Sequence, residues 1–281
     1  MKKLFASVIS AVLAVSTAFP VCANAAQNYY RKGDSNADDI IDGKDASYVL
    51  TLYSKSSVGK YNVSQIEMNY FDVNCDGVID GKDASEVLSY YSFSSVGGNA
   101  LPDCYFMTNL LENGKKDALV SAADNLFKQT CSAVFNFSTG ARYEIDNKSQ
   151  YKNLSYFRVK DPKIKTMADV LADFHSIFAD NYVTRYSATG DVFDALGGYV
   201  SDENGIVYGL GGARGSDVTY QYSKITDIKS MTGNSVTFNV LSHYDSTFLG
   251  KEGKVTDVNS DFKLVIQADG ALRVTEFTMP Y

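Results

Sequence analysis

The sequence predicts an α+β protein in two parts, a small all-α module followed by an α+β domain with helices on an antiparallel sheet. Two acidic stretches near the start are copies of each other, and each is followed by apolar residues at helical spacing. Further on, residues 117–178 carry apolar positions at helical spacing, whereas residues 206–279 contain runs that alternate apolar and polar residues. Helices followed by strands, rather than the two in alternation, indicate an α+β domain.

Residues 1–25 have the three regions of a secretory signal peptide. Residues 1–3 are basic, residues 4–21 are mostly apolar, and Ala23-Asn24-Ala25 has the small-residue pattern of a cleavage site. A membrane anchor is the alternative, but serine, threonine and proline residues interrupt the apolar run. We therefore expect cleavage directly after that pattern and a secreted protein. No later stretch approaches the roughly 18 apolar residues that span a bilayer, so we expect no membrane span in the mature protein.

Two loops, residues 34–45 and 72–83, place oxygen-bearing side chains at positions 1, 3, 5, 9 and 12. This is the ligand spacing of an EF-hand-type calcium loop, in which the backbone carbonyl at position 7 supplies a further oxygen. Residues 34–59 match residues 72–97 at 18 of 26 positions, so the pattern is duplicated with its offsets intact. We therefore expect two bound Ca2+ ions. The predicted ligands are Asp34, Asn36, Asp38, Ile40 (carbonyl), Asp42 and Asp45 in the first loop, and Asp72, Asn74, Asp76, Val78 (carbonyl), Asp80 and Asp83 in the second.

Position 6 differs between the two loops. Gly77 occupies it in the second loop, where the chain must turn sharply, but Asp39 occupies it in the first. A residue other than glycine is strained at positive φ, although Asp tolerates that region better than most residues do. We therefore expect the first loop to bind calcium more weakly than the second.

Each loop is followed by one helix rather than flanked by two, and position 12 is Asp in both loops instead of the Glu of helix-loop-helix calcium sensors. In both respects residues 29–98 resemble a dockerin module, and we predict that residues 26–98 form one. The resemblance implies an extracellular protein of an anaerobic fibre-degrading bacterium. It also implies calcium-dependent docking to the cohesin module of a scaffoldin, as in a cellulosome devoted to polysaccharide degradation.

In dockerins the cohesin contacts lie at loop positions 10 and 11 and at positions 17, 18 and 22 on the following helix. Gly43 and Gly81 stand at position 10, where Ser or Thr is often found, which leaves the class of cohesin open. The near-identity of the repeats implies that either could face the cohesin, the module turning about its pseudo-twofold axis. The resemblance implies contacts through Lys44, Leu50, Thr51 and Lys55 of the first repeat, or through Lys82, Leu88, Ser89 and Phe93 of the second.

The module should contain three short helices. Residues 46–53 and 84–91 each carry one apolar face, and because neither is long enough to be stable alone, the two should pack together. Ser64-Gln-Ile-Glu67 has the pattern of a capping box and predicts a third helix between the repeats. A Gly-Gly pair and a proline then mark a boundary, so we place a linker at residues 99–102 and a second domain at residues 103–281.

The second domain should fold as helices followed by a strand meander. Apolar periodicity predicts helices at residues 117–137 and 167–178. Residues 232–234 and 268–270 have the composition of hairpin turns. The predicted strands are residues 154–159, 206–210, 218–229, 235–244, 261–267 and 272–279.

The net charge and the number of cysteines argue against a nucleic-acid partner and against a disulfide framework. The net charge is −7 and there is no basic patch, so we do not expect a nucleic-acid partner. Three cysteines follow the signal peptide, an odd number that does not suggest a disulfide framework. Cys75 occupies a non-ligand position of the second loop, whereas Cys104 and Cys131 either pair or remain free.

No residue pattern in residues 103–281 signals an enzyme. His175 falls inside a predicted helix and fits a structural role, and His243 ends a strand with no recognisable nucleophile near it. A Cys–His pair using Cys104 or Cys131 has no flanking signature. The paired carboxylates of a glycoside hydrolase depend on separation in space, and the sequence leaves them open.

Residues 209–215 form a Gly-rich stretch between two predicted strands. Because a strand and not a helix follows, a tight bend is favoured over a phosphate-binding loop. Arg214, at the tip of that bend, is the candidate for an external contact, with a surface salt bridge as the alternative. Tyr220 and Tyr222, expected on one strand face, are candidates for a sugar platform, with packing at the sheet rim as the alternative.

The order of segments in residues 103–281 is similar to that of the secreted DL-endopeptidase inhibitor family. The similar segments are YFRVK, TMADVLADFHSIFADNY, GIVYGLGGARG and the terminal DFKLVIQADGALRVTEFTMPY. The resemblance implies a non-catalytic domain that binds a papain-like cell-wall peptidase and occludes its active-site cleft. The presence of only two histidines and no tryptophan favours this peptidase inhibitor over the alternative, a carbohydrate-binding module or small polysaccharide-active enzyme.

Overall fold

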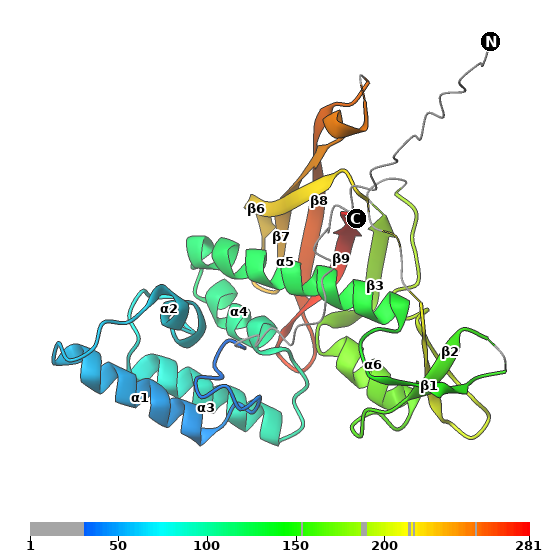
Figure 1. The fold of residues 1–281 in the computed structure, drawn as a ribbon. Coiled ribbons are helices and arrows are strands. Elements are labelled where there is room, and N and C mark those ends of the chain that lie inside the picture. The colour runs from blue at the N-terminus through cyan, green and yellow to red at the C-terminus, as the bar shows by residue number, and fades with distance from the viewer. Residues whose placement is uncertain (1–30, 153, 187–189, 213–214, 216, 251) are drawn as a thin grey trace, which may run out of the picture.

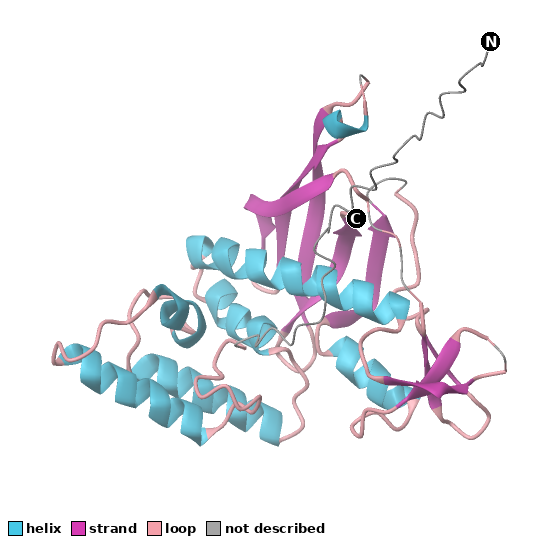
Figure 2. Cartoon of the chain, in the orientation of Figure 1, coloured by secondary structure: helices cyan, strands magenta, loops and turns pink. Residues whose placement is uncertain are grey.

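The computed structural model describes residues 31–281 except for residues 153, 187–189, 213–214, 216 and 251. Those residues form six α-helices and two β-sheets, which confirms the predicted α+β class (Figure 1). Helices alone build one end of the molecule, and the strands lie at the other (Figure 2). No helix in the described ranges has the length and apolarity to cross a membrane. The predicted signal peptide, residues 1–25, lies outside the described residues.

Three helices form the small module, and the two that follow the loops begin earlier than predicted. These two are α1 (Gly43–Ser57) and α3 (Gly81–Ser95), and each starts three residues before its predicted first residue. The cause is a capping box made inside each loop, because the position-9 Asp caps the helix while the position-12 Asp accepts a hydrogen bond from the cap backbone. The third helix, α2 (Gln65–Phe71), begins at the predicted capping box of Ser64 and Glu67.

A fourth helix, α4 (Pro102–Glu112), was not predicted and is shared by two hydrophobic cores. Proline stands at its first turn, where no intrahelical donor is required. Phe106 packs into the core of the small module, which also contains Val49 and Val87. Met107 and Leu110 on the same helix pack into the core of residues 103–281. Helix α4 therefore joins the two parts through packing on both sides.

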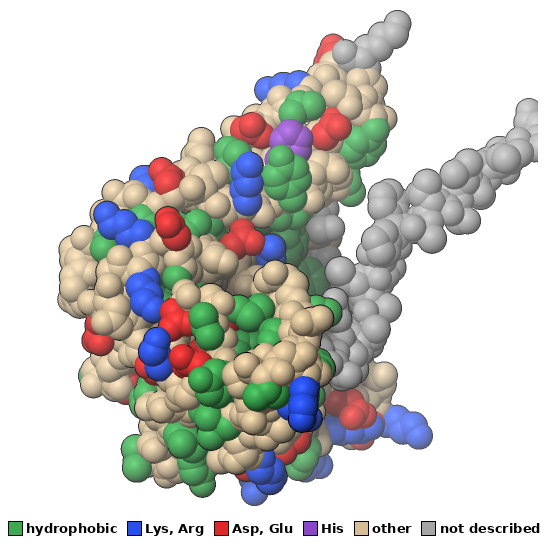
Figure 3. Space-filling model, turned by 90° about the vertical axis from the view of Figure 1, so that its left-hand side faces the viewer, with side chains coloured by type: hydrophobic (Ala, Val, Ile, Leu, Met, Phe, Trp, Pro, Cys, Tyr) green, Lys and Arg blue, Asp and Glu red, His purple; other side chains and the backbone are tan. Residues whose placement is uncertain are grey.

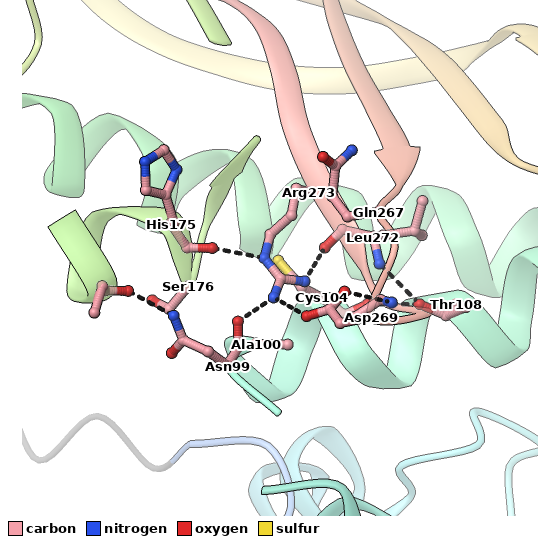
Figure 4. A network of polar contacts seen from close by, with 12 residues as sticks. Asn99, Ala100, Cys104, Thr108, His175, Ser176, Gln267, Asp269, Leu272 and Arg273 are labelled. Carbon is pink, nitrogen blue, oxygen red and sulfur yellow. Dashed lines mark hydrogen bonds and ion pairs between the residues drawn. The ribbon is translucent and has the colours of Figure 1, made fainter. Parts of the chain in front are cut away.

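The predicted linker, residues 99–102, is fixed in place by a buried arginine (Figure 4). Arg273 is 3% exposed and donates to the carbonyl of Asn99 and, at 2.8 Å, to the Asp269 carboxylate. It also donates to the carbonyl of His175 at 2.7 Å. Backbone N–H of Leu101 adds a bond to Ser176 O at 2.8 Å. This segment is therefore bound to the larger domain along its length.

The larger domain lays one long helix across a five-stranded sheet (Figure 1). Helix α5 (Lys116–Thr139) buries Leu126 and Phe127 against the sheet, where Phe127 meets the rings of Phe262 and Phe277 with centroids 5.4 Å apart in both pairs. The strand order is β3-β9-β8-β7-β6. The strands are β3 (Phe178–Tyr186), β6 (Tyr220–Met231), β7 (Ser235–Asp245), β8 (Val255–Ile266) and β9 (Leu272–Met279).

This sheet is mixed, which corrects the antiparallel prediction. Strand β3 pairs with β9 in parallel, while the other neighbours are antiparallel. The predicted helix over residues 167–178 ends earlier, as α6 (Met167–His175), and Phe178 instead begins β3. Phe178 is buried, so its apolar character suited either assignment.

A second, smaller sheet has the order β1-β2-β5-β4. Its strands are β1 (Ile145–Gln150), β2 (Tyr156–Val159), β4 (Tyr199–Ser201) and β5 (Val207–Leu210), of which β1 and β4 were not predicted. Gly140, the C-cap of α5, adopts φ 70° and lies directly against the backbone of Leu210 and Gly198. Glycine is required here because a Cβ would overlap both neighbours.

Substituting Gly140→Ala should destabilise the chain more than Gly114→Ala does. Both glycines have positive φ, 70° and 64°, but only Gly114 has open space around its Cα. We expect Gly114→Ala to cost about 1 kcal/mol in backbone strain. We expect Gly140→Ala to cost at least about 2 kcal/mol more, because the added methyl group must displace backbone. Denaturant unfolding of the two variants measures the difference, and equal losses would contradict the close packing.

Candidate calcium-binding site

The two predicted calcium loops, residues 34–45 and 72–83, share a set of hydrogen bonds from backbone N–H groups to side chains. In the second loop, Asp72 accepts from the N–H of Asp76 at 3.1 Å and from the N–H of Gly77 at 2.9 Å. The matching distances in the first loop are 3.2 and 3.0 Å. Each loop therefore wraps around the carboxylate at its position 1.

The side chains at positions 3 and 5 make a second matching set of bonds. Asn74 Oδ1 accepts from the N–H of Asp76 at 2.8 Å, and Asp76 Oδ1 accepts from the N–H of Val78 at 3.1 Å. In the first loop the corresponding distances are 2.9 and 3.0 Å. Because each side chain bonds the backbone two residues ahead, these turns pre-order the loop.

Two residues in each loop adopt the left-handed region. At position 6, Asp39 has φ 65° and Gly77 has φ 88°, so the first loop has Asp where a glycine is favoured, as the sequence indicated. Position 4 is also left-handed, in Ala37 (φ 57°) and Cys75 (φ 53°), which the sequence did not indicate. That the first loop binds calcium more weakly stays a prediction.

The carboxylates at positions 1 and 12 are buried. Asp34, Asp45, Asp72 and Asp83 are 1%, 0%, 7% and 0% exposed, and none of them pairs with a Lys or Arg in the described part of the chain. Burial raises the pKa of Asp83 to about 6, even though the N–H groups of Asp80 and Asn74 stabilise its charge. Burial likewise raises the pKa of Asp34. Buried negative charge without a cation is costly, so these loops call for a positive partner.

A lysine at position 11 lies beside the exposed carboxylates of each loop. Lys82 Nζ lies 3.0 Å from Asp76 Oδ2, and Lys44 Nζ lies 3.4 Å from Asp38 Oδ2. Burial alone would raise the pKa of Asp76, but the hydrogen bonds from Lys82 and Val78 lower it overall. Both lysines lie at the outer side of the loop and leave the buried carboxylates unpaired.

The donor set suits calcium in its chemistry. Within the described ranges, no three His, Cys, Asp or Glu side chains converge on one point, because the loop carboxylates are held by backbone N–H groups and by the lysines. The set is all oxygen, combines carboxylates with an amide and a carbonyl, and includes buried negative charge, which are the preferences of a hard divalent cation. The twelve predicted ligands are therefore the residues that would hold the two ions. Bound calcium would supply the positive charge that the buried carboxylates lack.

The residues predicted to contact a cohesin lie on the outer sides of α1 and α3. Lys44, Leu50, Thr51 and Lys55 of the first repeat are exposed, as are Lys82, Leu88 and Ser89 of the second. Figure 3 looks onto this end of the molecule and shows hydrophobic side chains among acidic and basic ones. Phe93 differs, because it is half-buried against the ring of Tyr105 at 4.9 Å and contacts Gly98. The two repeats therefore present different surfaces at position 22.

The cysteines of the described residues are free thiols. Cys104 and Cys131 are buried and do not pair with each other, and Cys75 is half-buried. Burial raises the pKa of Cys104 to about 12 and also raises that of Cys131. Such thiols stay protonated, which is the opposite of an activated nucleophile. Arg214, the candidate for an external contact, lies outside the described residues.

One histidine occupies an exposed polar cluster on the outer face of the sheet. His243 Nδ1 lies 2.7 Å from Asp257 Oδ1, and the ring of Tyr222 stacks on the imidazole with centroids 4.9 Å apart. The prediction that Tyr220 and Tyr222 share one strand face is wrong. A register shift in β6 pairs Tyr220 with Tyr244 and Tyr222 with His243. The extra residue places the two tyrosines on opposite sides of the sheet.

Comparisons with known proteins identify no family. No family model matches the chain, and no curated protein matches it. Among solved structures, the chain is similar to the iota-carbonic anhydrase from a cyanobacterium complexed with bicarbonate, with 17% identity and a TM-score of 0.16 over 70% of this chain and 92% of that chain. A likeness this weak carries no argument about fold or activity.

Replacing Asp39 by glycine should strengthen calcium binding at the first loop. The variant keeps the N–H that donates to Asp34 and removes the strain of a side chain at φ 65°. Relief of about 1 kcal/mol corresponds to roughly fivefold tighter binding, measurable by calorimetry. The mirror variant Gly77→Asp should weaken the second site by a similar factor. Unchanged affinities in both would show that position 6 does not limit binding.

Protons should compete with calcium at the second loop as the pH falls through about 6, the raised pKa of Asp83. A carboxylate must lose its proton to bind a metal ion, so affinity is constant well above that pH and falls by about tenfold per pH unit below it. Calcium titrations across this range measure the dependence. The Asp83→Asn variant, which has no proton to lose there, should bind weakly at every pH. A second-site affinity that ignores pH in this range would exclude Asp83 as a ligand.

Proposed function

We propose that this chain is a secreted, calcium-dependent docking protein. Its module would bind the cohesin module of a scaffoldin, and its larger domain would be the non-catalytic binding domain carried there. The observation that carries the proposal is the duplicated loop, in which buried carboxylates recur at positions 1 and 12 with matching bonds from backbone N–H groups. A solvated acidic turn has no reason to bury its charges twice in the same arrangement.

The first repeat is the better-suited docking face. All four of its predicted contact residues are exposed, whereas Phe93 of the second repeat packs against α4. Glu86, also on α3, accepts a hydrogen bond from Asn109 of α4 at 2.6 Å. Since α4 belongs partly to the larger domain, these contacts bind the second repeat to the rest of the chain. They favour presentation of α1 to the cohesin over equal use of both repeats.

For the larger domain we propose binding and inhibition of a papain-like cell-wall peptidase. Its buried, protonated thiols favour a binding role over cysteine chemistry of its own. The alternative is a carbohydrate-binding module or a small polysaccharide-active enzyme. Exposed Tyr222, stacked on His243, favours that alternative, although the bulge in β6 removes the two-tyrosine platform.

One experiment separates these functions on the full mature chain. Immobilised cohesin modules should retain it in calcium and release it in chelator. The same protein is then mixed with a papain-like cell-wall peptidase and, in parallel, with insoluble cellulose and xylan. Suppressed peptidase activity would support the inhibitor function. Retention on a polysaccharide with peptidase activity unchanged would favour a carbohydrate-binding module or a polysaccharide-active enzyme instead. Cohesin retention that is the same with and without calcium would overturn the docking proposal.

Position 22 offers a matched pair of variants. Lys55→Ala should weaken cohesin binding and leave the thermal midpoint unchanged, because Lys55 is exposed and contacts no core. Phe93→Ala should lower the stability by about 2–3 kcal/mol, because it removes ring packing against Tyr105 and Tyr90. Thermal unfolding and cohesin titration of both variants test this. If Phe93→Ala weakened cohesin binding and Lys55→Ala instead lowered the stability, the second repeat would be the docking face.

A further inference from the structure

Strand β8 is fully paired with β7 on one side but only partly paired with β9 on the other. It pairs with β7 from Val255 to Val265 in one unbroken antiparallel register. With β9, on its other side, it pairs only from Lys263 to Ile266. In Figure 1, β8 continues well past the end of β9 toward the β7–β8 turn. Within the described part of the chain, no segment pairs with this side of residues 255–262, which we call the free edge of β8.

Strand β9 leaves β8 because the C-terminal residues pack elsewhere. A register shift separates the pairings of Lys263 and Leu264 with β9. Beyond it, Pro280 O accepts a hydrogen bond from Tyr244 at 2.7 Å, and the Tyr281 ring packs on Tyr220 with centroids 4.9 Å apart. These contacts hold the chain end against β6 and β7, so it does not extend along β8.

A free edge of this kind exposes a row of backbone donors and acceptors that match another extended strand. Natural sheets protect such edges with lysine, proline, bulges or covering segments. Residues 255–262, VTDVNSDF, contain no lysine, proline or glycine, and their register with β7 has no bulge.

The opposite edge of the same sheet is protected. Strand β6 is interrupted by three register shifts against β7. In addition, Asp124 of α5 accepts a hydrogen bond from the backbone N–H of Ile225 at 3.1 Å, which occupies a donor of that edge. The contrast within one sheet indicates that the regular edge of β8, which no described segment covers, serves a purpose.

The charged side chains along the free edge indicate which charge a bound segment should carry. Asp257, Asn259 and Asp261 follow one another on one face of β8. Asp261 pairs with Lys229 of β6, whereas the Asp257 side chain remains 54% exposed despite its contact with His243, so Asp257 is the carboxylate that a bound segment would meet. At the lower end of the edge, where β3, β8 and β9 meet, a shallow depression of about 250 Å³ is lined in part by Arg185, Lys263 and Glu276. A second copy of this chain would bring like charges together, and the net charge of −7 adds to that repulsion.

We propose that residues 255–262 bind an extended peptide segment of a partner protein by β-strand addition, with a basic side chain of that segment placed beside Asp257. Backbone hydrogen bonds would supply affinity, and the Asp257 carboxylate would select a basic side chain over an acidic one at that position. This site is separate from the calcium module and holds whether or not the module docks to a cohesin.

The test follows amide hydrogen exchange of residues 255–262 in the full mature chain by NMR. The probe is an acetylated nine-residue peptide that alternates lysine with valine. Controls are the same peptide with alternate amides N-methylated, which cannot complete the ladder, and a version with glutamate in place of lysine. Without peptide, we expect fast amide exchange at alternate residues of 255–262. The lysine peptide should slow this exchange at least tenfold, and neither control peptide should slow it.

Charge reversal provides the matched variants. Asp257→Lys should abolish protection by the lysine peptide and transfer it to the glutamate peptide, whereas Asp227→Lys, the same change on β6, should alter nothing. The proposal is overturned if these amides exchange slowly in the free monomer, or if the lysine peptide leaves them unchanged. A concentration-dependent dimer in sedimentation, with the edge protected, would instead assign the edge to a second copy.

Discussion

The buried carboxylate at position 12 of each loop is the interaction on which the module depends. Asp45 accepts from the N–H of Asn36 at 3.2 Å, near the start of its loop, and from the N–H of Asp42 at 2.8 Å, near the end. Asp83 makes the corresponding bonds in the second loop at 3.3 and 2.8 Å. One side chain thus closes the loop and starts the helix. Because both loops do this, α1 and α3 emerge in matching fashion and pack together through Val49 and Val87. In the proposed calcium sites, the same two carboxylates would hold the ions and also place the helices.

The module is also built into the larger domain. Helix α4 contributes to both cores, and Arg273 fixes the segment that precedes it. The second loop itself touches the larger domain, since Lys115 Nζ donates to the carbonyl of Asn74 at 3.2 Å. The backbone of a predicted calcium loop is thereby held by a residue at the start of α5. A docking event at the module would accordingly position the larger domain, with its free β8 edge, in a defined orientation rather than on a loose tether.

Features set by local sequence patterns were predicted correctly for the most part. Most differences between the predicted and the observed structure involve pairing between segments far apart in the chain. The capping box at Ser64 and the hairpin turns are set by residues close in sequence, and the structure reproduces these features. The parallel pairing of β3 with β9 joins segments about 90 residues apart and leaves no local signature. The opposite orientation of Tyr220 and Tyr222 follows from one inserted residue, which alternation alone cannot reveal. The missed helix α4 lies where Gly-Gly and proline suggested a boundary, although proline equally begins a helix.

The most direct test is the number of calcium ions bound per chain, measured by native mass spectrometry of the mature protein after exchange into calcium. The account predicts two ions for the unmodified chain. It predicts one for Asp45→Ala and one for Asp83→Ala, because each variant removes the carboxylate that closes one loop. Zero ions in the unmodified chain, or two in both variants, would contradict the view that the duplicated loops are calcium sites.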